Sequence, residues 1–517
     1  MFFGILIFIA ARHRQKWLRY TAAEATFWVR LGVSKRLVNA SRRFSESRYN
    51  LYVLWFFILC FLLLAFSSAT LYLHFKHRLP AQKPPDAESL YNAGANQNKA
   101  GDYAGAISNF TKAVEVYSNY AEAYSFRAKA RYNLKDYNGA IIDANKAIEL
   151  NPDYEPAYNH RGFSRFGLKD YAGSIADFNK SIKLDSTYAP AYNQRGLAEA
   201  DLTNYPVAVN DFTKAIKLKP DYALAYYDRG LVEQAMTNYT AAIMDYGNAI
   251  ESYPNFPDAY NMRGFAKWCL KNYQGTIIDC TKAIELDPEL SAAYNNRGLA
   301  ESDLKNYTEA IVDLDKSIEL DHKSSVAYYN RGLAKHHLGN DTGAMADLNR
   351  AVELNPKDRS AYINLGLLQN ALFQFQSALK DFQEALQLDP SQDDCRFRIW
   401  LIRSRLDDRL GATEELKEYL DSLRHKKLTW SDAVGYFLVG SLSEKNFLDC
   451  ATKSDEKTQD WWRCRANYFV GMKHLIAGDK TGAMIYFQQC LDTKEINSSE
   501  YVSANVELEA LKKVVPP

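Results

Sequence analysis

Arginine and aspartate recur at fixed positions along the middle of this chain and are its most regular charged groups. In a period of 34 residues, one position is arginine and the position 16 residues later is aspartate. The arginines are Arg127, Arg161, Arg195, Arg229, Arg263, Arg297 and Arg331. The aspartates are Asp143, Asp177, Asp211, Asp245, Asp279, Asp313, Asp347 and Asp381. These charges could form a track for an extended ligand, or they could pair between neighbouring helices. Because the two types recur together, we favour a structural ladder of Arg–Asp pairs, which fixes geometry more surely than it adds stability.

A second position, two residues before the arginine, carries groups that could hydrogen-bond to a peptide backbone. It is occupied by Tyr91, Asn159, Asn193, Tyr227, Asn261, Asn295 and Tyr329. Asparagine and tyrosine suit backbone recognition without demanding one peptide sequence, so we predict that these residues line a protein-binding groove. Trp268 and His336 mark local variation and complete the candidate set. His336 and its neighbour His337 point about 100° apart on a helix, so a metal site is not expected there.

Catalytic constellations are not recognisable in the sequence. There is no nucleophile elbow, phosphate-binding loop, HExxH pair or paired carboxylates, and the nine histidines fall at unrelated positions. The seven cysteines show neither a CxxC pair nor zinc-ligand spacing. We therefore expect no enzyme, no cofactor, no metal and no small-molecule substrate. A disulfide between Cys450 and Cys464 is left open.

Seven glycines spaced by 34 residues identify the elements that position these groups. They are Gly162, Gly196, Gly230, Gly264, Gly298, Gly332 and Gly366. A fixed period of this length indicates one supersecondary unit copied along the chain. Apolar residues three and four apart predict two helices per unit, a proline ends the second helix in most units, and glycine lets the helices cross closely. Because one hairpin cannot bury its apolar face alone, we predict nine stacked units over residues 87–392.

This register of glycine, tyrosine, alanine and proline resembles that of the tetratricopeptide repeat (TPR) family. The resemblance implies an all-α fold, a TPR-type helical-hairpin solenoid or superhelix, whose first helices line a concave groove. It also implies protein or peptide partners bound in that groove. Some TPR domains grip the acidic tails of cytosolic chaperones with a set of lysine, asparagine and arginine residues, and no three consecutive units here show that set. This absence weakens a resemblance to the TPR import receptor of the mitochondrial outer membrane.

One transmembrane helix is predicted ahead of the solenoid, over residues 50–75. Residues 50–73 carry no charge, and a helix of that length extends about 36 Å, enough to cross a hydrocarbon core of about 30 Å. Residues 1–49 hold ten lysines and arginines against two acidic residues, so we expect them in the cytoplasm and the solenoid on the far side of the membrane. Residues 76–86 form a Pro-rich linker. A cleaved signal and a mitochondrial presequence are the alternatives.

Residues 393–517 are predicted to hold a degenerate repeat, a helical connector and terminal TPR or capping helices. Three stretches, 429–451, 464–491 and 500–511, resemble the closing module of bacterial TPR proteins of the NlpI-like lipoprotein kind. That resemblance implies an adaptor in the cell envelope.

The charge balance and these resemblances together predict a binding protein. Beyond residue 50 the chain has 53 basic and 60 acidic side chains, a net charge of −7, so nucleic-acid binding is not expected. We predict a membrane-anchored scaffold that binds peptides or partner proteins in the bacterial cell envelope. The alternatives are an organelle-membrane targeting receptor with a cytosol-facing TPR domain and a self-associating envelope protein.

Overall fold

The computed structural model describes residues 83–423, 429–452, 458–496 and 498–514, and every regular element in these ranges is an α-helix. The predicted basic segment and membrane span lie outside the described residues, as does most of the predicted linker. Within the described ranges, no helix combines the length and the hydropathy that a membrane span requires. The chain divides into two compact units, with the boundary after Ala123.

The described part of the first unit is one helical hairpin and the start of a third helix. Its helices are α3 (Pro85–Lys99), α4 (Tyr103–Val116) and the start of α5 (Ala121–Asn133). The ring centroid of Tyr91 lies 5.7 Å from that of Phe110 and 5.2 Å from that of Tyr120. These tilted aromatic pairs fix the hairpin against the residues that follow it.

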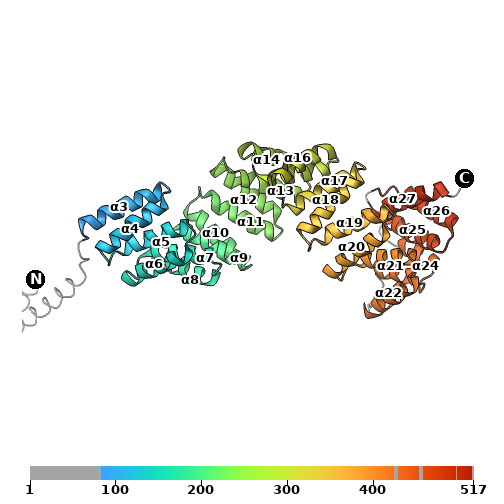
Figure 1. Ribbon diagram of the computed structural model, residues 1–517, viewed down its shortest axis with the longest axis horizontal. Helices are drawn as coiled ribbons and strands as arrows, with labels where there is room; N and C mark the ends of the chain where they lie inside the picture. The colour runs from blue at the N-terminus through green and yellow to red at the C-terminus, as the bar shows by residue number, and fades with distance from the viewer. Residues whose placement is uncertain (1–82, 424–428, 453–457, 497, 515–517) are drawn as a thin grey trace, which may run out of the picture. The chain divides into compact units, whose positions relative to one another are not determined.

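The second unit continues the same motif, and its successive hairpins lie side by side in Figure 1. The pairs are α5 with α6 (Tyr137–Leu150), α7 (Glu155–Gly167) with α8 (Tyr171–Leu184), α9 (Ala189–Asp201) with α10 (Tyr205–Leu218), α11 (Ala223–Ala235) with α12 (Tyr239–Ser252), α13 (Pro257–Cys269) with α14 (Tyr273–Leu286), α15 (Ser291–Asp303) with α16 (Tyr307–Leu320), α17 (Ser325–His337) with α18 (Asp341–Leu354), and α19 (Arg359–Ala371) with α20 (Phe375–Leu388). From α6 to α19, the second helix of each hairpin packs against the first helix of the next. The architecture is therefore an all-α helical-hairpin solenoid.

Each second helix begins just after a tight turn. In the hairpin of α7 and α8, Asp170 accepts a hydrogen bond of 3.0 Å from the backbone N–H of Gly173, which caps the helix. The preceding residue, Lys169, has a φ of 63°. The same left-handed conformation recurs one period earlier at Lys135 and one later at Thr203. The turn is thus imposed by the packing of the two helices, because lysine and threonine do not favour it on their own.

The recurring glycines lie where the two helices of a hairpin cross. A Cβ atom added at Gly196 would lie 2.8 Å from Cε1 of Phe212, and one added at Gly298 would lie 3.0 Å from the backbone oxygen of Ala310. Carbon atoms in contact are normally about 3.5–4.0 Å apart. The predicted close crossing at glycine is confirmed.

The last seven helices share one hydrophobic core. They are α21 (Asp393–Arg405), α22 (Arg409–Leu423), α23 (Trp430–Leu438), α24 (Glu444–Thr452), α25 (Gln459–Ile476), α26 (Lys480–Asp492) and α27 (Ser499–Val514). Trp400, Phe437 and Phe469 lie at its centre. Trp400 stands where the repeat would have glycine, and its Nε1 donates a hydrogen bond of 3.1 Å to Thr413 Oγ1. In this degenerate repeat, the large buried side chain of Trp400 therefore stands at the position where glycine allows a close helix crossing in the other units.

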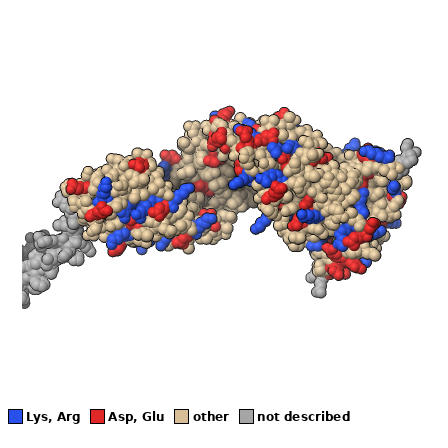
Figure 2. Space-filling model, viewed as in Figure 1, with Lys and Arg blue, Asp and Glu red and all other residues tan. Residues whose placement is uncertain are grey.

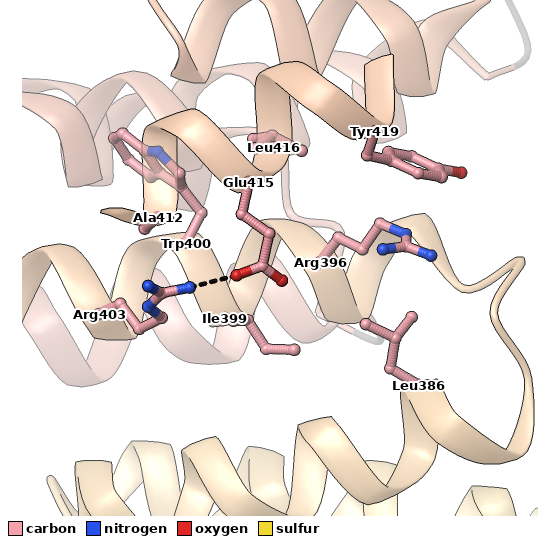
Figure 3. A pocket seen from close by; sticks show the side chains of 9 residues that line it. All are labelled: Leu386, Arg396, Ile399, Trp400, Arg403, Ala412, Glu415, Leu416 and Tyr419. Atoms are coloured by element: carbon pink, nitrogen blue, oxygen red, sulfur yellow. Dashed lines mark hydrogen bonds and ion pairs between the residues drawn. The ribbon is translucent and has the colours of Figure 1, made fainter. Parts of the chain in front are cut away.

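Figure 3 shows the junction between α20, α21 and α22, where polar side chains meet. Arg403 pairs with Glu415 at 2.5 Å, and the guanidinium of Arg396 lies 3.7 Å from the ring centroid of Tyr419. The space between these side chains is about 20 Å³, room for roughly one water molecule. We read this site as a packed structural junction, since it has no room for a ligand.

Opposite charges are paired locally on the outer helices. Lys282 pairs with Glu285 at 2.9 Å and Lys316 with Glu319 at 2.8 Å, in each case one turn apart on one helix. On the face shown in Figure 2, basic and acidic side chains are interspersed with uncharged surface. This face therefore shows no broad patch of one charge.

Candidate functional site: a groove along the first helices

The recurring arginines and aspartates form bidentate pairs inside seven successive hairpins, from α5 and α6 to α17 and α18. Arg195 donates from Nε to Asp211 Oδ2 at 2.8 Å and from Nη2 to Asp211 Oδ1 at 2.5 Å. The same pairs join Arg127 to Asp143, Arg161 to Asp177, Arg229 to Asp245, Arg263 to Asp279, Arg297 to Asp313 and Arg331 to Asp347. All seven aspartates are buried. The fork of the guanidinium matches both carboxylate oxygens, so the pair fixes the angle between the two helices.

The same arginines also reach the preceding hairpin. Nη1 of Arg161 donates to Asn145 Oδ1 at 2.7 Å, and Nη1 of Arg331 pairs with Asp315 at 2.6 Å. The guanidinium of Arg161 also lies 5.5 Å from the ring centroid of Tyr158, one turn earlier on its own helix. The recurring tyrosine and arginine thus act together as a tie between three helices. Their regularity reflects this structural task.

A third position decides how each aspartate is supported. Four residues after the arginine, the chain is basic in some units and acidic in others. The basic residues Arg165, Lys267 and Lys335 pair with the same buried aspartate at 2.8, 2.7 and 2.8 Å. The acidic residues Glu199, Glu233 and Glu301 instead accept hydrogen bonds from Asn204, Asn238 and Asn306. The basic and acidic residues that alternate at this position therefore both find partners within their own hairpins.

Four of the seven asparagines and tyrosines predicted to line the groove form hydrogen bonds from one hairpin to the next. Asn193 donates to Asp228 at 2.8 Å, Asn261 accepts from Asn296 at 2.9 Å, Asn295 accepts from Asn330 at 3.0 Å, and Tyr329 accepts from Asn364 at 3.0 Å. In every case the partner lies 35 residues later, on the next first helix. Asn159, Asn193 and Asn261 are only 3%, 1% and 4% exposed. Ligand contact through these residues stays a prediction, whereas their bonds between hairpins are visible.

The remaining candidates are dispersed. Tyr227 packs against Tyr246 and Phe256, with ring centroids 5.8 and 4.8 Å away. Trp268 donates from Nε1 to Asp303 at 2.6 Å, and His336 Nδ1 lies 2.7 Å from Asp341 Oδ1. Tyr91 packs inside the first unit. Of the whole predicted set, Asn159 is the residue that the structure brings to a sizeable cavity.

This cavity, of about 380 Å³, lies along the first helices α5 and α7, and Tyr188 also lines it. Phe126, Tyr132 and Phe163 form its aromatic wall. The ring centroids of Tyr132 and Phe163 are 5.6 Å apart, and Phe163 stands edge-on to Phe178 at 5.5 Å. The second helix beneath thus holds the wall in place. A cavity of this size suits one or two side chains of a bound peptide.

Four of the polar side chains that line this cavity belong to Lys129, Glu155, Asn159 and His160. Burial, with the charge of Lys129 adding to it, lowers the pKa of His160 to about 3, so its imidazole is neutral at pH 7, and its Nδ1 lies 2.9 Å from Ser125 Oγ. Burial raises the pKa of Glu155, whose carboxylate accepts hydrogen bonds from Ser181 and Asn159. Lys129 is exposed at the rim. Of the two charged groups, Glu155 is hydrogen-bonded to its neighbours and Lys129 is exposed to solvent. The charge that the cavity offers to a ligand is therefore positive.

Comparison with known families decides what kind of protein carries this groove. Models of the tetratricopeptide repeat match residues 121–154, 193–260, 291–324, 325–358 and 360–392. The chain contains tetratricopeptide repeats over these residues. TPR domains are scaffolds for protein–protein interaction and are typically not enzymes.

Several solved TPR structures are similar to this chain. YrrB, described as a TPR protein with an unusual peptide-binding site, is 22% identical, with a TM-score of 0.31 over 36% of this chain and 95% of that protein. PilF of Pseudomonas aeruginosa is 19% identical, with a TM-score of 0.37 over 43% of this chain and 98% of that protein. Yeast Tom70 is 20% identical, with a TM-score of 0.34 over 83% of this chain and 96% of that protein. No curated protein sequence matches the chain.

The cavity residues of this TPR protein were not singled out by the repeat pattern. Lys129 and Phe163 occupy a position that is leucine in most of the units, and Tyr132 occupies one that varies from unit to unit. Their signal in the sequence is departure from the period. A search for the least regular positions on the first helices would have found them.

Asp228, on the first helix α11, gives the TPR array a pH-dependent weakness. Burial raises its pKa to about 6, although Asn193 donates a hydrogen bond to it. The folded state thus binds this proton more tightly than the unfolded chain does, with its ordinary pKa of about 3.9. Stability is therefore lost as the pH rises from about 4 to about 6. We expect Asp228→Asn to raise the free energy of unfolding by about 1–3 kcal/mol at pH 7, because the amide removes the buried charge and can still accept from Asn193.

Urea unfolding at pH 7 and pH 4 checks this expectation. The gain should shrink at pH 4, where Asp228 is protonated in the folded state. The matched control is Asp221→Asn, since Asp221 lies exposed in the preceding loop. Equal stability of the Asp228→Asn and wild-type proteins at pH 7 would contradict the role given to this carboxyl.

Proposed function

We propose that this TPR scaffold binds an extended peptide in the groove along α5 and α7, and that the peptide presents a large apolar side chain next to a carboxylate. The observation that carries the proposal is the cavity of about 380 Å³ with Phe126, Tyr132 and Phe163 on its wall and Lys129 at its rim. An apolar side chain would be desolvated against the three rings. A neighbouring carboxylate of the peptide would pair with the ammonium group of Lys129. The one acidic residue that lines the cavity, Glu155, is already hydrogen-bonded to Ser181 and Asn159.

The groups on the cavity floor make the site selective. Glu155 is already hydrogen-bonded to Ser181 and Asn159, and His160 is neutral at pH 7. A cationic ligand side chain would therefore meet Lys129 without a free anion to balance it. The buried Oδ1 of Asn159 has no hydrogen-bond partner within the described residues. It offers an acceptor for a peptide N–H if the floor adjusts on binding.

Peptide selection tests this proposal. A random peptide library displayed on phage and selected on the full chain should yield sequences with an aromatic or large aliphatic residue beside an aspartate or glutamate. Lys129→Glu should then weaken the binding of a selected peptide about tenfold, roughly 1.4 kcal/mol, because it reverses the rim charge. The matched control is Lys214→Glu, an exposed lysine on the outer helix α10. Unchanged binding by the Lys129→Glu protein, measured by fluorescence polarisation, would contradict the assigned groove.

We further propose that the scaffold is anchored by residues 50–75, with the solenoid outside the cytoplasm. The support is the uncharged stretch and its basic flank in the sequence. The resemblance of the terminal module to NlpI-like proteins favours an adaptor in the bacterial envelope. The competing proposal is a receptor whose solenoid faces the cytosol. Protease added to intact spheroplasts should digest the solenoid in the first case and leave it protected in the second.

A further inference from the structure

The last hairpin of the chain holds two buried cysteines in contact. Cys464 lies in α25 and Cys490 in α26, both are 0% exposed, and their Sγ atoms are 2.6 Å apart. Heavy atoms that only touch are separated by about 3.5 Å or more, whereas bonded sulfurs lie about 2.05 Å apart. The two side chains therefore already point at each other across the hairpin, at a separation that suits bond formation better than mere packing.

The register of the repeat accounts for this contact independently of sulfur. Gly471 takes the glycine position of the last unit, which makes Cys464 its first residue and Cys490 the residue 26 places later. Residues with this separation also meet in other units. Ser291 Oγ lies 3.0 Å from Ser317 Oγ, Ser181 donates to Glu155, and Tyr419 donates to Asp393 at 2.6 Å. The solenoid thus brings these two positions together as a rule, and the last unit has cysteine at both.

We propose that Cys464 and Cys490 form a disulfide that closes the terminal hairpin. The hydrogen-bonding contact between the two thiols lowers the pKa of Cys464 and raises the pKa of Cys490. Ser498 Oγ, 3.5 Å from Cys464 Sγ, adds a second polar neighbour. Cys464 is therefore the more acidic of the two thiols in the folded hairpin.

The oxidant is a low-molecular-weight disulfide such as oxidised glutathione. The thiolate of Cys464 attacks one of its sulfurs, forming a mixed disulfide and releasing one thiolate. Cys490 then loses its proton and attacks Cys464 Sγ, which forms the protein disulfide and releases the second thiolate. Overall, two protein thiols are oxidised to one disulfide and one small disulfide is reduced to two thiols. Because both sulfurs are fully buried, these steps take place while the hairpin folds or when it opens locally.

The pairing differs from the Cys450–Cys464 bond left open by the sequence, because Cys464 meets Cys490. The bond would tie together α25 and α26, the two helices against which α27 packs. A covalent link across a loop of this length would stabilise the hairpin by restricting the unfolded chain.

Peptide mapping of the full chain tests the proposal. After equilibration with oxidised glutathione and alkylation in denaturant, non-reducing digestion should yield the peptide containing Cys490 linked to the one containing Cys464, with Cys280 and Cys395 alkylated. In wild-type protein, adding reductant should lower the melting temperature of the terminal hairpin by roughly 5 °C or more. In the Cys464→Ser/Cys490→Ser protein it should have no effect, and Cys280→Ser should leave the link intact. Complete alkylation of both cysteines, or linkage of Cys464 to Cys450, overturns the proposal, and the wild-type map decides even if the double variant does not fold.

Discussion

Replacing Asp177 by alanine is expected to lower the free energy of unfolding of its hairpin by about 3–5 kcal/mol. Asp177 is 2% exposed and accepts hydrogen bonds from Nε and Nη2 of Arg161, with Nη1 of Arg165 at 2.8 Å. Removing the carboxylate leaves the guanidinium of Arg161 partly buried without its counter-charge, and leaves Arg165 with Asp170 at 3.6 Å in place of the closer partner. It also releases Arg161 from the geometry in which it reaches Asn145 on the preceding hairpin. The loss should therefore extend beyond α7 and α8 to their contact with α6.

Hydrogen exchange of α6 to α8, read together with urea unfolding of the whole protein, measures this loss. A regional readout is needed because repeat arrays open locally and are not strictly two-state. Two controls come from the same chain. Asp211→Ala should cost less, since Arg195 is the one ion-pair partner of Asp211 among the described residues. Glu319→Ala removes an exposed pair with Lys316 and should change stability by no more than about 0.5 kcal/mol. If Asp177→Ala cost no more than Glu319→Ala, the ladder would not be a structural tie.

The fold was predictable from the sequence because its signals repeat. Each glycine of the 34-residue period marks a close crossing, where an added Cβ atom would lie 2.7–3.1 Å from the nearest atom, and nine copies of a weak pattern make a strong one. The arginines and aspartates were also interpretable, since two charges that always recur together satisfy each other. The left-handed backbone conformation in the turn could not be predicted, because Lys169 and Thr203, which adopt it, are not residue types that favour it. It is imposed by the two helices packed on either side.

The binding site was less predictable because repetition along the sequence reveals the fold and does not reveal which residues contact a ligand. Asparagine and tyrosine recur at the predicted groove position, and recurrence indicated that they matter without showing what they contact. In the structure, Asn193 and Asn261 bond to the next hairpin and are buried. A residue that reads a particular ligand has no reason to repeat. Lys129 and Tyr132 line the cavity, and both differ from the residues at the same positions of other units. The positions on a first helix that indicate a binding site are therefore those at which the units differ.

The opposite effects expected for two glycine-to-alanine changes test the packing of the whole array. Gly196→Ala should destabilise its hairpin by about 1–3 kcal/mol, because the added Cβ would lie 2.8 Å from Cε1 of the fully buried Phe212. Gly247→Ala should instead stabilise α12 by about 0.5–1 kcal/mol, since a Cβ there meets only Arg263 Nη1, at 3.8 Å. Both changes give the same gain in helix propensity. The difference in sign isolates the cost of the crossing.

The chain itself shows which second change should reduce that cost. In the hairpin of α5 and α6, the glycine position is Ala128, and the position that holds Phe212 in the later hairpin is Ala144. Alanine is therefore accepted at the crossing where the facing residue is small. We expect Phe212→Ala alone to cost about 3–5 kcal/mol through the cavity it leaves. The double variant with Gly196→Ala should cost about 1–3 kcal/mol less than the sum of the two single changes, because the new methyl group occupies part of that cavity. Strict additivity in thermal or urea unfolding would show that Gly196 and Phe212 do not share one packing site, and the account of the period as a series of helix crossings would then fail at its central residue.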